Sequence, residues 1–312
     1  MRKPDFFVVG AAKSGTTSLY YYLSQNPEIY LPPIKEPVYF AKDLVEKYYR
    51  CGKEVEVFNP KVYFSKKPYP SRHIVYFKDF KYYSMLFEDI DESKKAVGEM
   101  SAVYLASKVS AKNIFDFNPD AKIIVILRNP VERAFSQFLM RLRDGKISET
   151  NFLTEVLRDY NMSENECKVE YIERGLYFPQ LKRFFDLFPK ENIKIILFED
   201  FISDTKNVLK DLFLFLNVSP ISVNTDEVKN KGKLPKFPLF NRRLKSFRRK
   251  MFFLFPDKMP GWVVSLYDFL FMNSKKPVLS KSEREKLLEF FKEDIEKTQK
   301  LINRDLSDWL KV

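Results

Sequence analysis

Cysteine and histidine are scarce in this sequence of 312 residues, which has two cysteines and one histidine. Cys51 and Cys167 form no CxxC pair, and His73 is the single imidazole that could join them around a metal ion. Structural zinc sites and disulfide frameworks need several such residues at defined spacings. We therefore expect no metal site and no disulfide. A chain without disulfides is typical of the cytoplasm, which is the expected location.

Long hydrophobic runs are also missing from the sequence. A transmembrane helix needs roughly 18–20 consecutive apolar residues. The most apolar stretch, residues 251–272, is interrupted by two prolines and three charged residues. Residues 1–5 lack the apolar core of a signal peptide and lead directly into a strand-like segment. We expect neither a membrane span nor general secretory export, and association with a membrane surface stays open.

Acidic residues are outnumbered by basic ones, with 42 Asp and Glu against 54 Lys and Arg, so that the formal net charge is +12. Residues 229–250 contain ten of these cations and no acid. Such a segment suits a nucleotide, a polyanionic sugar, a lipid surface or a nucleic acid, and it also matches a solvated basic helix face. Three phenylalanines lie among the cations, as in single-strand binders. Because no recognised nucleic-acid module accompanies them, we expect no nucleic-acid partner.

Apolar runs of strand length alternate with segments of helical periodicity along the chain. Strands are expected at 6–9, 96–98, 122–127 and 193–198, and helices at 16–23, 131–142, 176–188, 208–216 and 283–301. Residues 51–73 are polar and contain three prolines, which indicates an irregular excursion. The alternation predicts an α/β fold with a mostly parallel central sheet flanked by helices. Residues 1–312 are interpreted as a single domain.

A glycine-containing loop joins the first expected strand to the first expected helix. It reads Gly10-Ala11-Ala12-Lys13-Ser14-Gly15-Thr16-Thr17. In a three-layer fold of this P-loop-like kind, the backbone N–H groups of such a loop converge on an anion. Lys13 adds a positive charge, and Thr16 and Thr17 add hydroxyl donors. The loop predicts a phosphate-type site, with an ordinary glycine turn as the alternative.

The same loop differs from that of a kinase or nucleoside triphosphatase, which is the main alternative function. Those enzymes place Lys and then Ser or Thr directly after the second glycine, where the hydroxyl holds magnesium. Here Gly15 is followed by Thr16, and the strand at 122–127 ends in Arg128 rather than in an acid. The pattern disfavours a metal and favours a second anion site. A triphosphatase would show magnesium-dependent ATP turnover.

Two segments resemble the sulfotransferases that use 3′-phosphoadenylyl sulfate (PAPS), in their heparan-sulfate-type and bacterial branch. Residues 6–40 resemble the 5′-phosphosulfate loop, and residues 122–136 resemble the 3′-phosphate motif, with the sequence KIIVILRNPVERAFS. Further matches at 175–177, 195–201 and 306–309 extend the resemblance over nearly the whole chain. It implies transfer of a sulfuryl group to a hydroxyl or amine of a carbohydrate or glycan-like acceptor. Adenosine 3′,5′-bisphosphate would be the second product, and no metal would be needed.

The resemblance also implies roles for individual residues. Lys13 would stabilise the charge of the leaving group, and Glu36, within Lys35-Glu36-Pro37-Val38-Tyr39-Phe40, would be the general base. The residues that would bind the nucleotide are Ala12, Lys13, Ser14, Gly15, Thr16, Thr17, Arg128, Ser136, Lys231, Gly232 and Lys233.

Alternatives remain for several of these residues. Glu36 could be an exposed turn residue, and Arg128 could be paired with Glu132. His73 is the second candidate for the base, because cytosolic small-molecule sulfotransferases use a histidine. Met100 stands where relatives carry a lysine, which Lys35 or a lysine of residues 229–236 could replace. The identity of the acceptor and the oligomeric state are not determined by these patterns.

Overall fold

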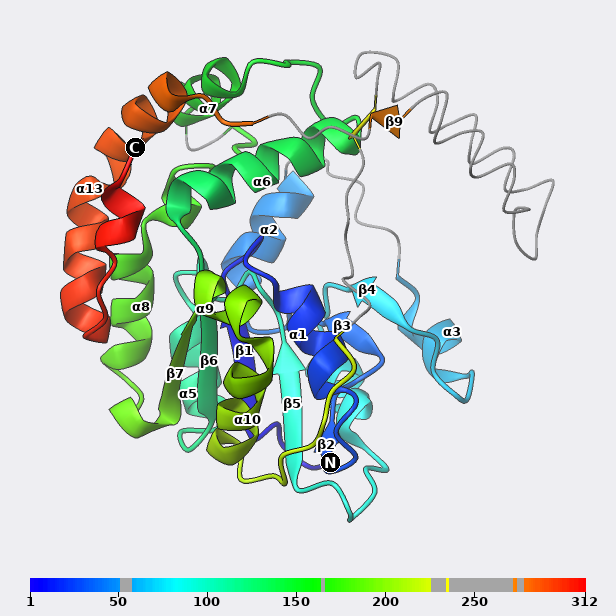
Figure 1. The fold of residues 1–312 in the computed structure, drawn as a ribbon. Coiled ribbons are helices and arrows are strands. Elements are labelled where there is room, and N and C mark those ends of the chain that lie inside the picture. The colour runs from blue at the N-terminus through cyan, green and yellow to red at the C-terminus, as the bar shows by residue number, and fades with distance from the viewer. Residues whose placement is uncertain (51–57, 164–165, 226–233, 236–271, 274–277) are drawn as a thin grey trace.

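The computed structural model describes residues 1–50, 58–163, 166–225, 234–235, 272–273 and 278–312. Within these residues a central sheet is covered by helices on both faces (Figure 1). Its strands follow the order β2-β5-β1-β6-β7, and every neighbouring pair is parallel. The strands are β1 (Phe6–Gly10), β2 (Ile29–Tyr30), β5 (Ala96–Met100), β6 (Lys122–Leu127) and β7 (Ile193–Leu197). The predicted fold class and the four predicted strands are confirmed, and β2 was not predicted.

Side chains of successive residues in β1 and β6 enter two separate apolar cores, as the alternation of a strand requires. Phe7, Val9 and Ile123 belong to the larger cluster, whereas Phe6, Val8 and Ile124 belong to the smaller one. Both faces of these strands are therefore buried, which explains why β1 and β6 have continuous apolar sequences rather than alternating ones.

Three helices cover the smaller core: α1 (Thr16–Leu23), α9 (Phe198–Ser203) and α10 (Thr205–Phe215). The larger core is covered by α5 (Ser110–Phe117), α6 (Pro130–Arg143), α8 (Tyr177–Phe185) and α13 (Lys281–Ile302). The predicted helices are confirmed, with ends that differ by a few residues. The expected helix at 176–188 ends at Phe185, and Phe198 begins α9 instead of ending a strand. Helix α13 packs against both α8 and α6 (Figure 1).

Shorter elements surround this framework. They are α2 (Lys42–Arg50), α3 (Pro60–Phe64), α4 (Phe80–Ser84), α7 (Phe152–Asn161) and the 3-10 turns η1 (Met85–Phe87), η2 (Glu173–Gly175), η3 (Lys190–Asn192) and η5 (Ser307–Leu310). Strands β3 (Ile34–Glu36) and β4 (Arg72–Ile74) form a parallel pair, and β8 (Leu234–Pro235) and β9 (Met272–Asn273) an antiparallel one. The expected irregular excursion at 51–73 was therefore partly wrong, since it includes α3 and part of β4.

The expectation of no disulfide was also wrong, because Cys167 is disulfide-bonded. Cys51, the other cysteine of the sequence, lies outside the described residues. The pattern-based argument failed because two cysteines far apart in sequence carry no local signal for pairing. In the part of the chain that the structure describes, none of the helices has the length and apolarity required to cross a membrane.

Candidate active site

The carboxyl ends of β1, β5 and β6 meet at one edge of the sheet, and the candidate site lies there. Parallel strands place the loops that follow them side by side at this edge. Ala11 N donates to Ile126 O at 2.7 Å, and Leu105 N donates to Val9 O at 2.7 Å. Backbone hydrogen bonds thus tie the glycine loop to β6 and the turn after β5 to β1.

The glycine loop leads from β1 into α1, as its sequence predicted. Gly15 adopts a left-handed φ of 92° at the start of α1, and a side chain there would also lie 3.2 Å from the ring of Phe198. Ser14 is completely buried, and its hydroxyl has no hydrogen-bond partner. The Tyr177 hydroxyl lies close to it without reaching normal hydrogen-bond geometry. A buried hydroxyl of this kind is ordinarily satisfied by a ligand or a water molecule.

Lys13 lies in a strongly positive environment. Its Nζ contacts the Met140 sulfur at 3.3 Å. Burial and the nearby Arg143 together lower the pKa of Lys13 from 10.5 to about 8, while Asp144 acts in the opposite direction. Arg128 also contributes to the lowering. An anion placed among these groups would offset both the repulsion between the cations and the cost of burying the Lys13 ammonium group. The cluster is therefore suited to binding an anion.

Arg128 follows β6 directly and is oriented by the start of α6. Asn129 caps this helix by accepting hydrogen bonds from Val131 N and Glu132 N. The Arg128 guanidinium lies 3.3 Å from the carbonyl of Lys13 and 4.7 Å from the centre of the Phe198 ring. Burial lowers the pKa of Arg128, and Glu132 opposes this effect. The second predicted cation thus lies next to the glycine loop.

The alternative interpretation of Arg128 was an ion pair with Glu132, and the structure contains only a long contact between the two side chains. Arg128 Nη2 lies 3.7 Å from Glu132 Oε2, which is longer than a charge-assisted hydrogen bond. The other carboxylate oxygen of Glu132 bonds to Arg284. Ser136 is half-buried on α6, Thr16 is buried at the first turn of α1, and Thr17 is half-buried beside it.

Glu36 and Lys35 are buried at the end of β3. The Lys35 Nζ lies 2.6 Å from Glu36 Oε1, and both side chains are less than a tenth exposed. The alternative of an exposed turn glutamate is therefore wrong.

His73 is brought to the same place by β4, although its sequence context had indicated an incidental residue. The β3–β4 register pairs Ile34 with Arg72 and Glu36 with Ile74, so that position 73 lies beside Lys35. His73 is exposed on one side, but surrounding atoms partly desolvate its imidazole, which lowers its pKa. Lys35 and Lys13 lower it further, and Glu36 raises it. Lys35, Glu36 and Lys13 therefore lie close enough to His73 to influence its protonation.

A buried carboxylate that the sequence analysis did not single out supports this part of the site. Glu99, at the end of β5, accepts hydrogen bonds from Tyr83 Oη at 2.9 Å and from Ser101 Oγ at 2.7 Å. Burial raises the pKa of Glu99 to about 7. Ser101 Oγ accepts from Val38 N at 3.2 Å, directly after the Glu36 segment. The Glu99–Ser101 pair therefore fixes the backbone that carries Glu36.

Not every predicted residue is placed by the structure. Lys231, Gly232 and Lys233 lie outside the described residues. Met100 is buried in the smaller core with Leu19 and Leu23, so its side chain packs there. Lys35 is the cation that lies against Glu36.

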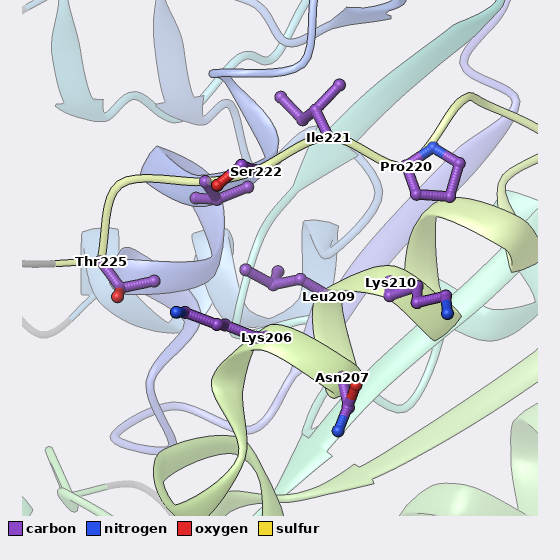
Figure 2. A pocket seen from close by; sticks show the side chains of 9 residues that line it. Lys206, Asn207, Leu209, Lys210, Pro220, Ile221, Ser222 and Thr225 are labelled. Atoms are coloured by element: carbon purple, nitrogen blue, oxygen red, sulfur yellow. The ribbon is translucent and has the colours of Figure 1, made fainter.

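A pocket elsewhere on the surface contains none of the predicted site residues. It lies between α10 and residues 220–225, where Lys206, Lys210, Ser222 and Thr225 contribute to its lining (Figure 2). The cation cluster at the carboxyl edge of the sheet, rather than this pocket, has the charge and the buried unpaired hydroxyl of a functional site.

Comparisons with known proteins identify a family for this chain. Residues 3–233 match the sulfotransferase domain family. Mouse carbohydrate sulfotransferase 15 is 24% identical over 273 residues, covering 73% of this chain and 46% of that protein. The membrane-associated sulfotransferase kil1 of Dictyostelium discoideum is 24% identical over 323 residues, covering 78% of this chain and 62% of that protein. The chain spans about half the length of the mammalian relatives that it matches.

A solved structure is similar over its full length. The crystal structure of a sulfotransferase from Alicyclobacillus acidocaldarius superposes with a TM-score of 0.67 at 30% sequence identity, and each chain is covered completely. The overall fold is therefore similar to that of a sulfotransferase.

Proposed function

Since the chain belongs to the sulfotransferase domain family, we propose that it transfers a sulfuryl group from PAPS to a hydroxyl or amine of an acceptor. The observation that carries this proposal is the pair of cationic sites at one edge of the sheet. Lys13 lies in the glycine loop and Arg128 at the end of β6, and the Arg128 guanidinium reaches the Lys13 carbonyl at 3.3 Å. One nucleotide with a phosphate group at each end of its ribose matches two adjacent cationic sites.

The residues at this edge fit the chemical groups of PAPS. The buried, unpaired hydroxyl of Ser14 and the N–H groups at the start of α1 would bind the 5′-phosphate. The planar guanidinium of Arg128 suits the 3′-phosphate, with the Ser136 hydroxyl on the following helix. Lys231, Gly232 and Lys233 stay predicted nucleotide contacts outside the described residues.

The proposed reaction needs a proton acceptor and a stabiliser of the leaving group. The acceptor oxygen or nitrogen forms a bond to sulfur while the bond from sulfur to the 5′-phosphate oxygen breaks, and that oxygen keeps the electron pair. Lys13 stabilises the resulting negative charge. Glu36 takes the proton of the acceptor, with His73 as the second candidate. The products are the sulfated acceptor and adenosine 3′,5′-bisphosphate.

We propose a carbohydrate or glycan-like acceptor, because several of the curated relatives are carbohydrate sulfotransferases. The cytoplasmic location stays a prediction, and the disulfide at Cys167 argues for an oxidising compartment instead.

Calorimetric titration with adenosine 3′,5′-bisphosphate tests the donor site directly. We expect binding by the wild-type protein, and we expect Arg128→Ala to weaken it about 10–100-fold, as for loss of a charge-assisted hydrogen bond. Labelled PAPS offered with a panel of sugars would then identify the acceptor. Absence of any binding of the bisphosphate would refute the proposed function.

A further inference from the structure

Glu132 lies between two arginines that come from distant parts of the chain. Its Oε2 atom is 3.7 Å from Nη2 of Arg128, the proposed 3′-phosphate ligand. Its Oε1 atom bonds to Nη2 of Arg284, at the start of α13. All three side chains are about one fifth to one third exposed, at 31% for Glu132, 21% for Arg128 and 23% for Arg284. The carboxylate is thus shared, and Arg284 holds the tighter contact.

The position of Arg284 is defined by the local structure of α13. Ser280 and Glu283 form a capping box that fixes the first turn of the helix, and Arg284 N donates to Ser280 O at 3.0 Å. Helix α13 packs against α6 and α8, so this first turn lies against the turn that carries Glu132. The segment lies beyond residues 3–233, to which the family match extends.

A free carboxylate at the position of Glu132 would compete with a phosphate for Arg128. A bidentate pair between an arginine and a carboxylate occupies the donors that a phosphate needs, and it also cancels the positive potential. Since Glu132 lies one helical turn after Arg128, only a small side-chain movement would close the present 3.7 Å gap. The contact with Arg284 holds the carboxylate away from this pairing.

Other groups hold the backbone of Arg128. Arg284 therefore affects only whether the Glu132 side chain pairs with the Arg128 side chain. Tyr177 Oη donates to the Arg128 carbonyl at 2.8 Å, and Asn129 Nδ2 donates to the Trp309 carbonyl at 3.3 Å. Glu199 is a second acid near Arg128, and it accepts from Asn129 N at 3.4 Å.

We propose that Arg284 is a positioning residue that sequesters Glu132 and thereby keeps Arg128 available for the 3′-phosphate of the nucleotide. The inference rests on the proposed function, because it assigns a 3′-phosphate to Arg128. It gives the C-terminal helix a defined part in donor recognition.

The test measures the dissociation constants of adenosine 3′,5′-bisphosphate and of adenosine 5′-monophosphate, which lacks the 3′-phosphate, by calorimetry. We expect Arg284→Gln to weaken binding of the bisphosphate about two- to fivefold, in the range of partly exposed ion pairs, and to leave the monophosphate unchanged. The double variant Arg284→Gln/Glu132→Gln should recover the wild-type affinity, because no carboxylate remains to compete. Arg284→Lys keeps the charge and should stay near wild type.

Arg304→Gln is the matched control, because Arg304 also makes an ion pair from the C-terminal segment, with Asp200 at 2.7 Å. It should leave both affinities unchanged. An equal loss for the two nucleotides, or a double variant that binds as weakly as Arg284→Gln, would overturn the inference. If the wild-type protein binds the bisphosphate and Arg284→Gln binds it equally well, the inference alone fails. If the wild-type protein binds no bisphosphate, both the inference and the proposed function fail.

Discussion

Lys13 combines two properties that oppose each other in the free protein. It is placed for contact with a phosphate, yet burial and neighbouring arginines lower its pKa to about 8. Folding therefore disfavours the ammonium form, and the ligand favours it. The lysine is charged at neutral pH but begins to lose its proton under mildly alkaline conditions.

Binding of adenosine 3′,5′-bisphosphate at pH 8.5 should therefore take up a fraction of one proton per site. The phosphate raises the pKa of Lys13 again, and the nucleotide phosphates themselves are already ionised at this pH. Calorimetry in two buffers of different ionisation enthalpy measures the uptake. Lys13→Arg, which stays charged, should abolish it, and an unchanged uptake in that variant would assign the proton to another group.

Glu36 and His73 compete for the same catalytic role, and the structure places both Glu36 and Lys13 near His73. Glu36→Gln should lower turnover about 10²–10⁴-fold, the usual contribution of a general base, and leave the affinity for adenosine 3′,5′-bisphosphate unchanged. His73→Gln is the matched comparison. The assignment of the base to Glu36 would be reversed if His73→Gln caused the larger loss in a labelled PAPS assay.

At the scale of elements, the end of β5 determines where the segment after β3 lies. Glu99, Ser101 and Tyr104 are completely buried, and Ser101 and Tyr104 accept hydrogen bonds from Val38 N and Phe40 N. The segment at 38–40 has no partner in the central sheet, so these side chains replace the missing strand contacts. Glu99 accepts the hydrogen bond of Ser101 beneath this segment, and it is therefore buried.

Ser101→Ala should destabilise the protein by about 1–3 kcal/mol, because it leaves the buried Val38 N–H without a partner. Since the backbone beside Glu36 would shift, turnover should fall while the affinity for adenosine 3′,5′-bisphosphate is kept. Urea unfolding and kinetics on one preparation measure both effects. Ser84→Ala, at an exposed hydroxyl that donates to Lys81 O, is the control and should change stability by less than about 0.5 kcal/mol. Equal stability of the two variants would contradict the role of Ser101.

At the scale of the whole molecule, α13 connects the C-terminus to the site. Asp294 on this helix accepts hydrogen bonds from Tyr177 N at 2.7 Å and Phe178 N at 3.1 Å, which caps the start of α8. Burial raises the pKa of Asp294 from 3.8 to about 6. Because its pKa is higher in the folded than in the unfolded state, folding favours the protonated form.

Wild-type protein should therefore lose stability relative to Asp294→Asn as the pH rises from about 4 to about 6. The direction follows from proton binding, since the folded state holds more protons than the unfolded state in this range. Urea unfolding of both proteins at intervals across this range measures the difference. A difference that does not vary with pH would show that Asp294 keeps its ordinary pKa.

The sequence by itself determined the parallel sheet, the glycine loop and the cation at the end of β6. These features depend on contiguous residues, because apolar strands such as 122–127 and the loop at 10–17 fold according to local pattern and glycine geometry. It also placed Glu36 shortly after the first helix, but it left open whether that residue was buried.

Only the tertiary structure decided which distant residues meet. His73 reaches Glu36 through the pairing of β3 with β4, and Arg284 reaches Glu132 across 152 residues. Glu99 became part of the site because its strand ends at the same sheet edge, and the disulfide of Cys167 had no local signal. The physical reason is common to these cases. Each contact depends on how separate elements pack, which residue type and spacing along the chain do not specify.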